Sequence, residues 1–393
     1  MNNSSDDNVT SEYTLEHLTS DYIEIVATIL ITAVGLPINL YVGCKLWRTY
    51  SRYTATHQPR ELKMVMVTLK LHLTLANLLV LLLYCPWKVV WLITYQWKIG
   101  GDLGCRLLQF CWLFAFCISS NIVVCIAVDR ARIVWKLCNI AKDAKALTTI
   151  ASSSQKFVRR LLVGAWTLAF LCSVPQVVVW RHVTLAGWEQ CATVWAINRA
   201  LIEQRMISEN DPSLASWTLS TRWANAYQVF HVCTVFWLPF SIVLISYVFI
   251  LSNLVRFACV PYTDLRMSLS TSQYSRPFDD CTQAAEERGE EKCHPQLRPV
   301  PSEVMLRPNV VVVTKRRTSR LPVWRTQMRS RVFRTTALVV ICYSLCWLPY
   351  NVISLARLLD EGVAQLLSEN FEWLKVVILL SAVLNPFIYG FRE

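Results

Sequence analysis

Asn385-Pro386-Phe387-Ile388-Tyr389 closes the last of seven apolar segments in the chain. A proline inside a membrane-spanning helix frees backbone hydrogen-bonding groups, which neighbouring helices or water must satisfy. Such breaks are tolerated where helices move against each other. The stretch therefore favours a switching membrane protein over a static anchor.

The composition supports a membrane protein, because 54% of the 393 residues are apolar and the mean hydropathy is +0.36. Segments of about 20 apolar residues, enough to cross roughly 30 Å of hydrocarbon, fall at Tyr22–Leu46, Met64–Trp87, Leu107–Val128, Val158–Val179, Ala226–Ile250, Ala337–Leu355 and Phe371–Tyr389. We therefore predict an all-α membrane protein, a seven-transmembrane helix bundle. Residues 1–21 are polar and acidic, so we expect the first span to act as the insertion signal.

Charge placement predicts the orientation of the bundle. The segments Lys45–Lys63, Arg130–Arg160 and Arg256–Arg334 hold 28 of the 39 lysines and arginines. Alternate loops are thus basic, which predicts that they are cytosolic, with the N-terminus outside and the C-terminus cytosolic. The net charge of +12 then reflects topology and attraction to anionic lipid, and we expect no nucleic-acid partner.

Two sets of residues fit an extracellular location. Asn2, Asn3 and Asn8 each begin an Asn-x-Ser/Thr triplet, a possible glycan acceptor in the predicted outer tail, although chance matches are common in polar tails. Cys105 opens the third span and Cys191 lies between spans four and five. Both are predicted extracellular, so we expect a disulfide that holds this loop over the bundle.

We expect an extracellular tail at residues 1–21 and one seven-transmembrane domain at 22–392. Residues 257–324 interrupt the apolar pattern with many prolines and an acidic run, which predicts a disordered third cytosolic loop. The sequence ends at Glu393, so either it is incomplete there or the protein lacks a cytosolic tail rich in serine and threonine.

Three features could form a switch near the cytosolic face. Asp129-Arg130-Ala131 lies at the inner end of span three, where the arginine could leave its neighbouring acid to bind a cytosolic partner. Cys346-Trp347-Leu348-Pro349 places a bulky side chain before a proline kink in span six. Span five contains Pro239 and, two turns inward, Tyr247. Taken singly, each feature is also compatible with interfacial snorkelling or simple packing.

Together these features resemble the rhodopsin family of G-protein-coupled receptors. The matching positions, in chain order, are Asn39, Val42, Leu75-Ala76-Asn77, Cys105, Asp129-Arg130, Trp166, Pro239, Tyr247, Trp347, Pro349, Asn385-Pro386 and Tyr389. The resemblance implies that Asp129, Arg130, Tyr247, Pro349, Asn385, Pro386 and Tyr389 form the activation switch that couples to a heterotrimeric G protein.

Within that family, the run His72-Leu73-Thr74-Leu75-Ala76-Asn77 is very similar to gonadotropin-releasing-hormone receptors. Leu379 stands at the opsin lysine position, and Trp112 stands where amine receptors keep an acid. The resemblance implies a neuropeptide receptor of the gonadotropin-releasing-hormone/adipokinetic-hormone type that acts through Gq and calcium. The alternatives are a vasopressin/oxytocin-like peptide, another peptide, or an orphan receptor.

The same resemblance implies a ligand pocket between the outer halves of the spans. Trp91, Gln176, Trp347 and Tyr350 keep the residue types expected there, and the aromatic ones can stack on an aromatic-rich peptide. Lys88 replaces a usual acid, and Trp112 replaces a usual lysine. We expect Lys88 to meet an acidic loop or peptide group, with snorkelling toward headgroups as the alternative.

Two neutral amides, Asn77 and Asn385, occupy the positions at which most family members hold a sodium ion, beside Ser119. We expect them to bond to each other and to water, with no sodium effect. Arg329 stands where some relatives place an acid that latches Arg130, so we expect Asp129 alone to restrain that arginine.

Other classes of protein fit poorly. The six histidines have no metal-ligand spacing, and no nucleophile–base set appears, so we expect no enzyme, no cofactor and no metal site. A transporter or channel remains the alternative from a different class. It should place acids along its path, yet the only acids between Lys45 and Asp129 are Glu61 and Asp102, near span ends.

Overall fold

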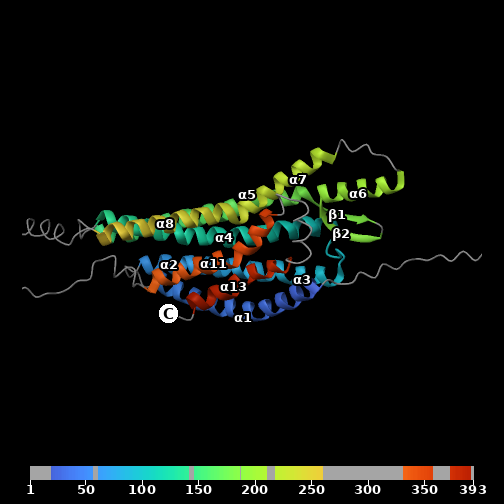
Figure 1. The fold of residues 1–393 in the computed structure, drawn as a ribbon. Coiled ribbons are helices and arrows are strands. Elements are labelled where there is room, and N and C mark those ends of the chain that lie inside the picture. Colours follow the sequence, from blue (N-terminus) through green and yellow to red (C-terminus); the bar gives the residue numbers. More distant parts are fainter. Residues whose placement is uncertain are drawn as a thin grey trace, which may run out of the picture. The chain divides into compact units, whose positions relative to one another are not determined.

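The computed structural model describes residues 19–55, 61–140, 146–185, 187–209, 217–259, 331–356 and 372–390. Its spans are α1 (Thr19–Ala55), α2–α3 (Glu61–Leu79, Cys85–Thr94), α4 (Gly101–Ile140), α5 (Ala146–Val179), α7–α8 (Trp217–Val232, Leu238–Cys259), α11 (Arg331–Ala356) and α13 (Lys375–Gly390) (Figure 1). Six are long and apolar enough to cross a membrane. The seventh, α13, has 16 residues after a 3-10 turn at Glu372–Leu374. The predicted seven-helix bundle is confirmed.

The helices extend beyond the predicted spans. The apolar run Leu107–Val128, for example, is the middle of the 40-residue helix α4. Hydropathy marks only the part of a helix that contacts lipid or core, whereas the polar ends continue with the same backbone hydrogen bonds.

Helix α4 is the central element of the bundle. Its apolar window is 72% buried, compared with 28% for the windows of α1 and α5. Side chains such as Leu113, Ile118, Ile122 and Ile126 lie in the main core cluster. A helix buried on nearly every side must be apolar on nearly every side, as this one is.

Two prolines widen the helices that contain them. The π-helical stretches η1 (Val80–Tyr84) and η3 (Cys233–Trp237) each end two residues before a proline, Pro86 or Pro239. A proline lacks the backbone N–H, and its ring pushes away the carbonyl one turn earlier. The local backbone hydrogen bonds therefore join residues five apart instead of four. Both stretches lie in walls of the pocket described below.

The connection after α5 is more ordered than the long loop predicted from sequence. It forms an antiparallel hairpin, β1 (Trp180–Leu185) and β2 (Trp188–Thr193), followed by helix α6 (Val194–Glu209). Gly187 has φ +83°, a conformation that glycine adopts without steric cost, and it closes the turn between Leu185 and Trp188.

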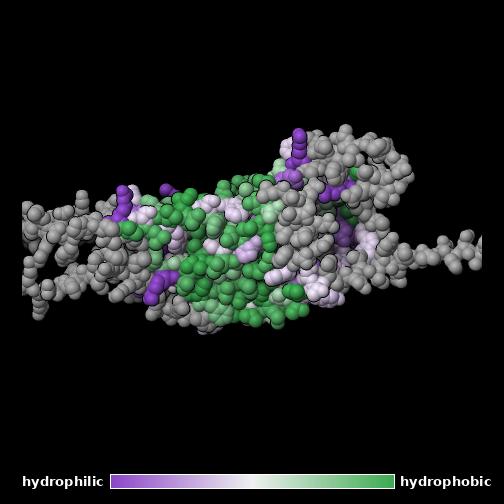
Figure 2. Space-filling model, in the orientation of Figure 1, coloured by the Kyte–Doolittle hydropathy of each residue, from purple (hydrophilic) through white to green (hydrophobic). Residues whose placement is uncertain are grey.

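The faces of the helices that point away from the bundle are apolar. Figure 2 shows apolar side chains covering the visible face between more polar ends. Large apolar side chains that are more than half exposed occur on most spans, for example Leu30, Tyr41, Val163, Ile245 and Leu345. Such a continuous surface requires a lipid environment.

Several predicted features lie outside the described residues. They are the glycosylation sites Asn2, Asn3 and Asn8, Arg329, and nearly all of the predicted cytosolic loop, from residue 260 onward.

Candidate ligand pocket and activation elements

The hairpin is fixed over one end of the bundle. A disulfide joins Cys105 of α4 to Cys191 of β2, with Cα atoms 5.6 Å apart, as the sequence predicted. The backbone N–H of Trp97 donates to the Glu189 carbonyl at 2.7 Å. The backbone N–H of His182 donates to the carboxylate of Asp102 at 3.0 Å. Three attachments therefore hold both strands.

A cavity of about 550 Å³ lies at this end of the bundle, with walls from α3, α4, α5, α7, α11, α13 and the hairpin. All six residues predicted to bind ligand line it: Lys88, Trp91, Trp112, Gln176, Trp347 and Tyr350. The structure thus brings together positions separated by up to 262 residues in the chain. Its described lining contains Lys88 and Lys375 and no carboxylate.

Sequence reasoning missed much of the polar wall. Gln109 of α4 and Asn351 of α11 also line the cavity, as do Asn225, Gln228 and His231 of α7. The last three recur every third residue, so they share one face of the helix. That spacing was a usable signal. A wall rich in amides offers both donors and acceptors to a ligand.

Lys88 finds its acidic partner on another helix. Its Nζ lies 3.5 Å from Oε1 of Glu24 in α1 and 5.5 Å from the centre of the Trp91 ring. The side chains of Lys88 and Glu24 are only 14% and 4% exposed. Glu24 of α1 is therefore an acidic partner of Lys88, on a helix where the sequence gave no reason to expect one.

Trp112 has a structural role as well as a place in the wall. Its indole N–H donates to the Leu83 carbonyl in η1 at 2.6 Å. Its ring lies 6.0 Å from Trp91, 6.3 Å from Trp97 and 5.2 Å from Tyr84. This aromatic cluster packs against the Cys105–Cys191 disulfide. Trp112, where the resemblance led us to expect a lysine, is thus an aromatic and uncharged part of the wall.

Several buried polar atoms of lining residues have no hydrogen-bond partner among the described residues. Two of them are Oε1 of Gln176 and the indole N–H of Trp347, which belong to residues that are 3% and 2% exposed. Each buried polar group that makes no hydrogen bond lowers the stability of the fold by about 1–3 kcal/mol. One is an acceptor and the other a donor, and both belong to side chains that line the cavity.

Trp347 also connects the cavity to the middle of the bundle. The centre of its ring lies 5.8 Å from that of Phe116 in α4, 6.4 Å from that of Phe236 in η3 and 5.3 Å from that of Tyr343. Tyr343 in turn donates to the Ser120 hydroxyl at 3.3 Å. A ligand that moves Trp347 therefore displaces a proline-widened stretch and a buried hydrogen bond.

The predicted pairing of Asn77 with Asn385 is wrong. The Asn77 amide donates to Oδ1 of Asn39 at 3.3 Å, and Oδ1 of both Asn77 and Asn385 lacks a partner among the described residues. Asn39 donates to the Ala382 carbonyl at 2.8 Å. Ser119 is buried as expected, at 5% exposure. Asn39 of α1 thus bonds to both α2 and α13. It is the partner of Asn77 that we expected Asn385 of α13 to be.

The opposite end of α4 holds the buried ion pair of Asp129 and Arg130, whose side chains are 0% and 6% exposed. Ser154 donates to Asp129 at 3.5 Å. The hydroxyl of Tyr247 has no hydrogen-bond partner among the described residues. As the sequence predicted, the neighbouring acid holds Arg130.

Near this end, Tyr389 of α13 hydrogen-bonds to Thr74 of α2 at 2.8 Å. Lys45 of α1 donates to the Gly390 carbonyl at 3.0 Å, where a cation stabilises the C-terminal end of a helix. Pro349 and Pro386 lie inside α11 and α13. The predicted switch residues therefore lie on four helices, α4, α8, α11 and α13, of which α11 contacts both α4 and α13.

Comparison with known proteins gives matches over nearly the whole chain. The family model described as "7 transmembrane receptor (rhodopsin family)" matches residues 53–389. The "G-protein coupled receptor daf-38" of Caenorhabditis elegans is 30% identical over 404 aligned residues, which cover 96% of this chain and 90% of that protein. The "Gonadotropin-releasing hormone II receptor" of Callithrix jacchus is 26% identical over 365 residues, which cover 91% and 74%. That of Clarias gariepinus is 22% identical over 376 residues, which cover 95% and 76%.

Proposed function

Because the chain belongs to the rhodopsin family of seven-transmembrane receptors, we propose that its ligand is an extracellular peptide of the gonadotropin-releasing-hormone/adipokinetic-hormone type. We further propose that it signals through a G protein of the Gq class. Family membership makes the protein a G-protein-coupled receptor of the plasma membrane rather than an enzyme.

One observation carries the proposal for the ligand: six positions chosen by resemblance to peptide receptors line a single cavity. The wall combines the aromatic surfaces of Trp91, Trp112 and Trp347 with the amides of Gln109 and Gln176. Backbone amides of a peptide carry one donor and one acceptor per residue, which such a wall can match. Relatives named as gonadotropin-releasing-hormone receptors support the same ligand class.

The mechanism follows from the contacts below the cavity. A peptide that engages Trp347 changes its packing against Phe236 and Tyr343 and so shifts α11 at Pro349, where the helix lacks a backbone hydrogen bond. Movement of α11 opens the end of the bundle at which Asp129 holds Arg130. Arg130 can then donate to the backbone of the G protein, since a guanidinium offers five N–H donors.

Calcium mobilisation in cells expressing the full chain, screened against a neuropeptide library, tests the receptor, the ligand class and the G-protein class together. The Gln176→Ala variant should lower the potency of the active peptide about tenfold, the effect of one lost buried hydrogen bond. Ser173→Ala is the matched control, because Ser173 is buried one turn earlier in α5 and donates only within its own helix.

Each part of the proposal can fail separately. A response to a non-peptide ligand alone would refute the peptide class. A peptide response through cyclic AMP without calcium would refute the Gq class. A vasopressin-like peptide as the only agonist would keep the pocket and change the ligand type.

A further inference from the structure

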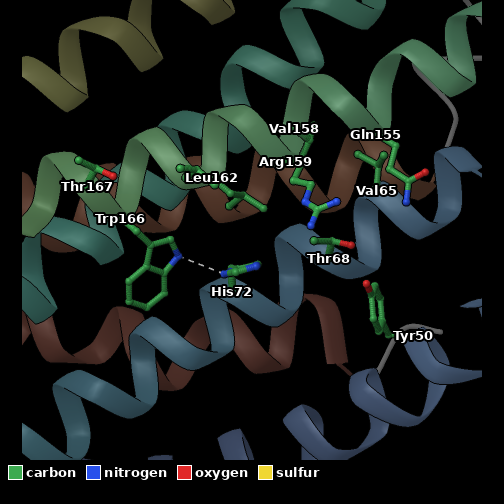
Figure 3. A pocket seen from close by; sticks show the side chains of 11 residues that line it. Tyr50, Val65, Thr68, His72, Gln155, Val158, Arg159, Leu162, Trp166 and Thr167 are labelled. Carbon is green, nitrogen blue, oxygen red and sulfur yellow. Dashed lines mark hydrogen bonds between the residues drawn. The ribbon is translucent and has the colours of Figure 1, made fainter.

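The ligand cavity contains two lysines that the mechanism proposed above does not involve. Lys88 lies in α3 and Lys375 begins α13, and both line the cavity. The groove between α2 and α5, by contrast, has one lysine or arginine, Arg159, in its described lining (Figure 3). Two cations in one cavity attract an anion more strongly than one does, because their attractions add.

The two lysines belong to one wall of the cavity. Helix α1 contacts both α3 and α13, and η1, directly before α3, also contacts α13. Cys85, three residues before Lys88, shares a core cluster with Val376, the residue after Lys375. Residues three apart are neighbours on the surface of a helix. The two ammonium groups therefore extend from neighbouring helices beside the same packed cluster.

The described residues of this wall carry more positive than negative charge. Nζ of Lys88 lies 3.5 Å from Oε1 of Glu24, which does not line the cavity. Nζ of Lys375 lies 5.9 Å from the centre of the Tyr350 ring, which does. Two ammonium groups and one carboxylate leave an excess of one positive charge, and no residue of the described lining carries a carboxylate.

This charge selects among peptide ligands. A lysine or arginine of the ligand would meet charges of its own sign here, which is unfavourable. A carboxylate instead accepts hydrogen bonds from two ammonium groups through its two oxygens. Since an ammonium has three N–H donors, Lys88 can donate to such a ligand and still pair with Glu24.

We propose that Lys88 and Lys375 together bind a carboxylate of the ligand, from an acidic side chain or from a free C-terminus. Glu24 is then a positioning residue, because it holds the ammonium group of Lys88 at the wall. This inference rests on the proposed function, since it assigns an anion subsite within the pocket of a peptide receptor.

Peptides in matched sets test the subsite through the calcium response of cells that express the full chain. Each neuropeptide is tested unchanged, with each aspartate or glutamate replaced by its amide, and with its C-terminus as a carboxylate or an amide. In the wild type, neutralising one carboxylate should lower potency about tenfold, the effect of a lost charge-assisted hydrogen bond. The position of that carboxylate distinguishes a side chain from the C-terminus as its source.

The Lys375→Gln variant should lower the potency of the carboxylate peptide about tenfold and leave that of its neutral analogue unchanged, because only the former has a charge to pair. Lys98→Gln is the matched control, since Lys98 is exposed just after α3 and does not line the cavity. Lys375→Glu should reverse the preference, so that an analogue with lysine in place of the carboxylate becomes the more potent peptide.

The double variant Glu24→Gln/Lys88→Gln removes the other cation without leaving a buried charge unpaired. At equal surface expression it should show the same selective loss as Lys375→Gln. A peptide agonist whose neutral analogues are all equally potent at the wild type would overturn the inference and leave the proposed function intact. So would equal losses in Lys375→Gln and Lys98→Gln. A chain that reaches the cell surface and responds to no peptide would refute the proposed function itself, and the anion subsite with it.

Discussion

The two ends of α4 differ in how the polar groups that we assign to function are paired. At the pocket end, Oε1 of Gln176 and the indole N–H of Trp347 are buried without partners among the described residues. At the other end, about 27 Å along the helix from Trp112, Asp129 pairs with Arg130, and Tyr389 bonds to Thr74. The first arrangement can gain free energy from a ligand, whereas the second must lose contacts before the bundle can open.

This contrast implies that one end of the bundle binds the ligand and the other keeps the bundle closed. Unpaired polar groups at the pocket leave hydrogen bonds for a ligand to complete, and the ion pair of Asp129 with Arg130 at the opposite end keeps the unliganded state closed. A ligand shifts such an equilibrium only by its difference in affinity for the two states. Variants that alter one end without the other can therefore test the contrast.

The largest effect is expected for Arg130→Gln, which removes the guanidinium that we propose binds the G protein. Agonist-evoked calcium output should fall to background while surface expression and peptide binding persist. Arg132→Gln, two residues further along α4, serves as the control because its guanidinium lies over the Phe157 ring, 4.0 Å from its centre. Intact evoked output in Arg130→Gln would refute the coupling scheme.

A second large effect concerns the Glu24–Lys88 pair. Glu24→Gln leaves the lysine charge 14% exposed with its acidic partner removed, and breaking a buried pair costs about 3 kcal/mol. We expect a clear drop in the thermal unfolding temperature of the purified receptor. The double variant Glu24→Gln/Lys88→Met should recover most of the loss, since it removes the remaining charge. Equal thermal unfolding temperatures for the wild type and Glu24→Gln would show that the pair does not stabilise the fold.

The Glu24–Lys88 pair also shows what sequence reasoning could and could not reach. Residues with a fixed place in one helix, such as Trp347 or Arg130, were placed correctly because resemblance and helical spacing suffice for them. Partners across helices were not. Whether Lys88 meets Glu24, or Asn77 meets Asn39 rather than Asn385, depends on how each helix is rotated about its axis, and a single sequence does not encode that rotation visibly.

Local backbone features were missed for a different reason. The π stretches before Pro86 and Pro239 change the direction in which every later side chain of the helix points about the helix axis. The hydropathy of the sequence does not distinguish a π turn from an α turn. The hairpin β1–β2 has mixed polarity, and its register depends on the turn at Gly187 and on the disulfide at Cys191.

A smaller effect is expected for Asp129→Asn at the closed end. The neutral amide weakens the contact that holds Arg130, and a hydrogen bond to a charged group contributes about 1.5 kcal/mol or more. The open population, and with it basal inositol phosphate production, should rise roughly tenfold. Ser154→Ala, which removes only the long contact to Asp129, should raise it much less. Basal output at or below the wild-type level in Asp129→Asn would contradict this role.

The smallest expected effect is that of sodium, which should not change agonist affinity at constant ionic strength. Two amide oxygens without partners, on Asn77 and Asn385, could suggest a cation site. A desolvated cation, however, needs a negative charge nearby. The only buried carboxylates among the described residues, on Glu24 and Asp129, are each already paired with a cation.

Agonist competition binding in sodium chloride and in choline chloride measures this directly. Asn77→Asp supplies the missing charge, so it should make agonist affinity sensitive to sodium. Asn39→Asp tests the same charge at the residue to which Asn77 donates. A steep loss of wild-type agonist affinity in sodium would mean that the amide oxygens of Asn77 and Asn385 suffice to hold the ion. In that case, incomplete hydrogen bonding would mark an ion site in the middle of the bundle as well as a ligand site at the pocket end.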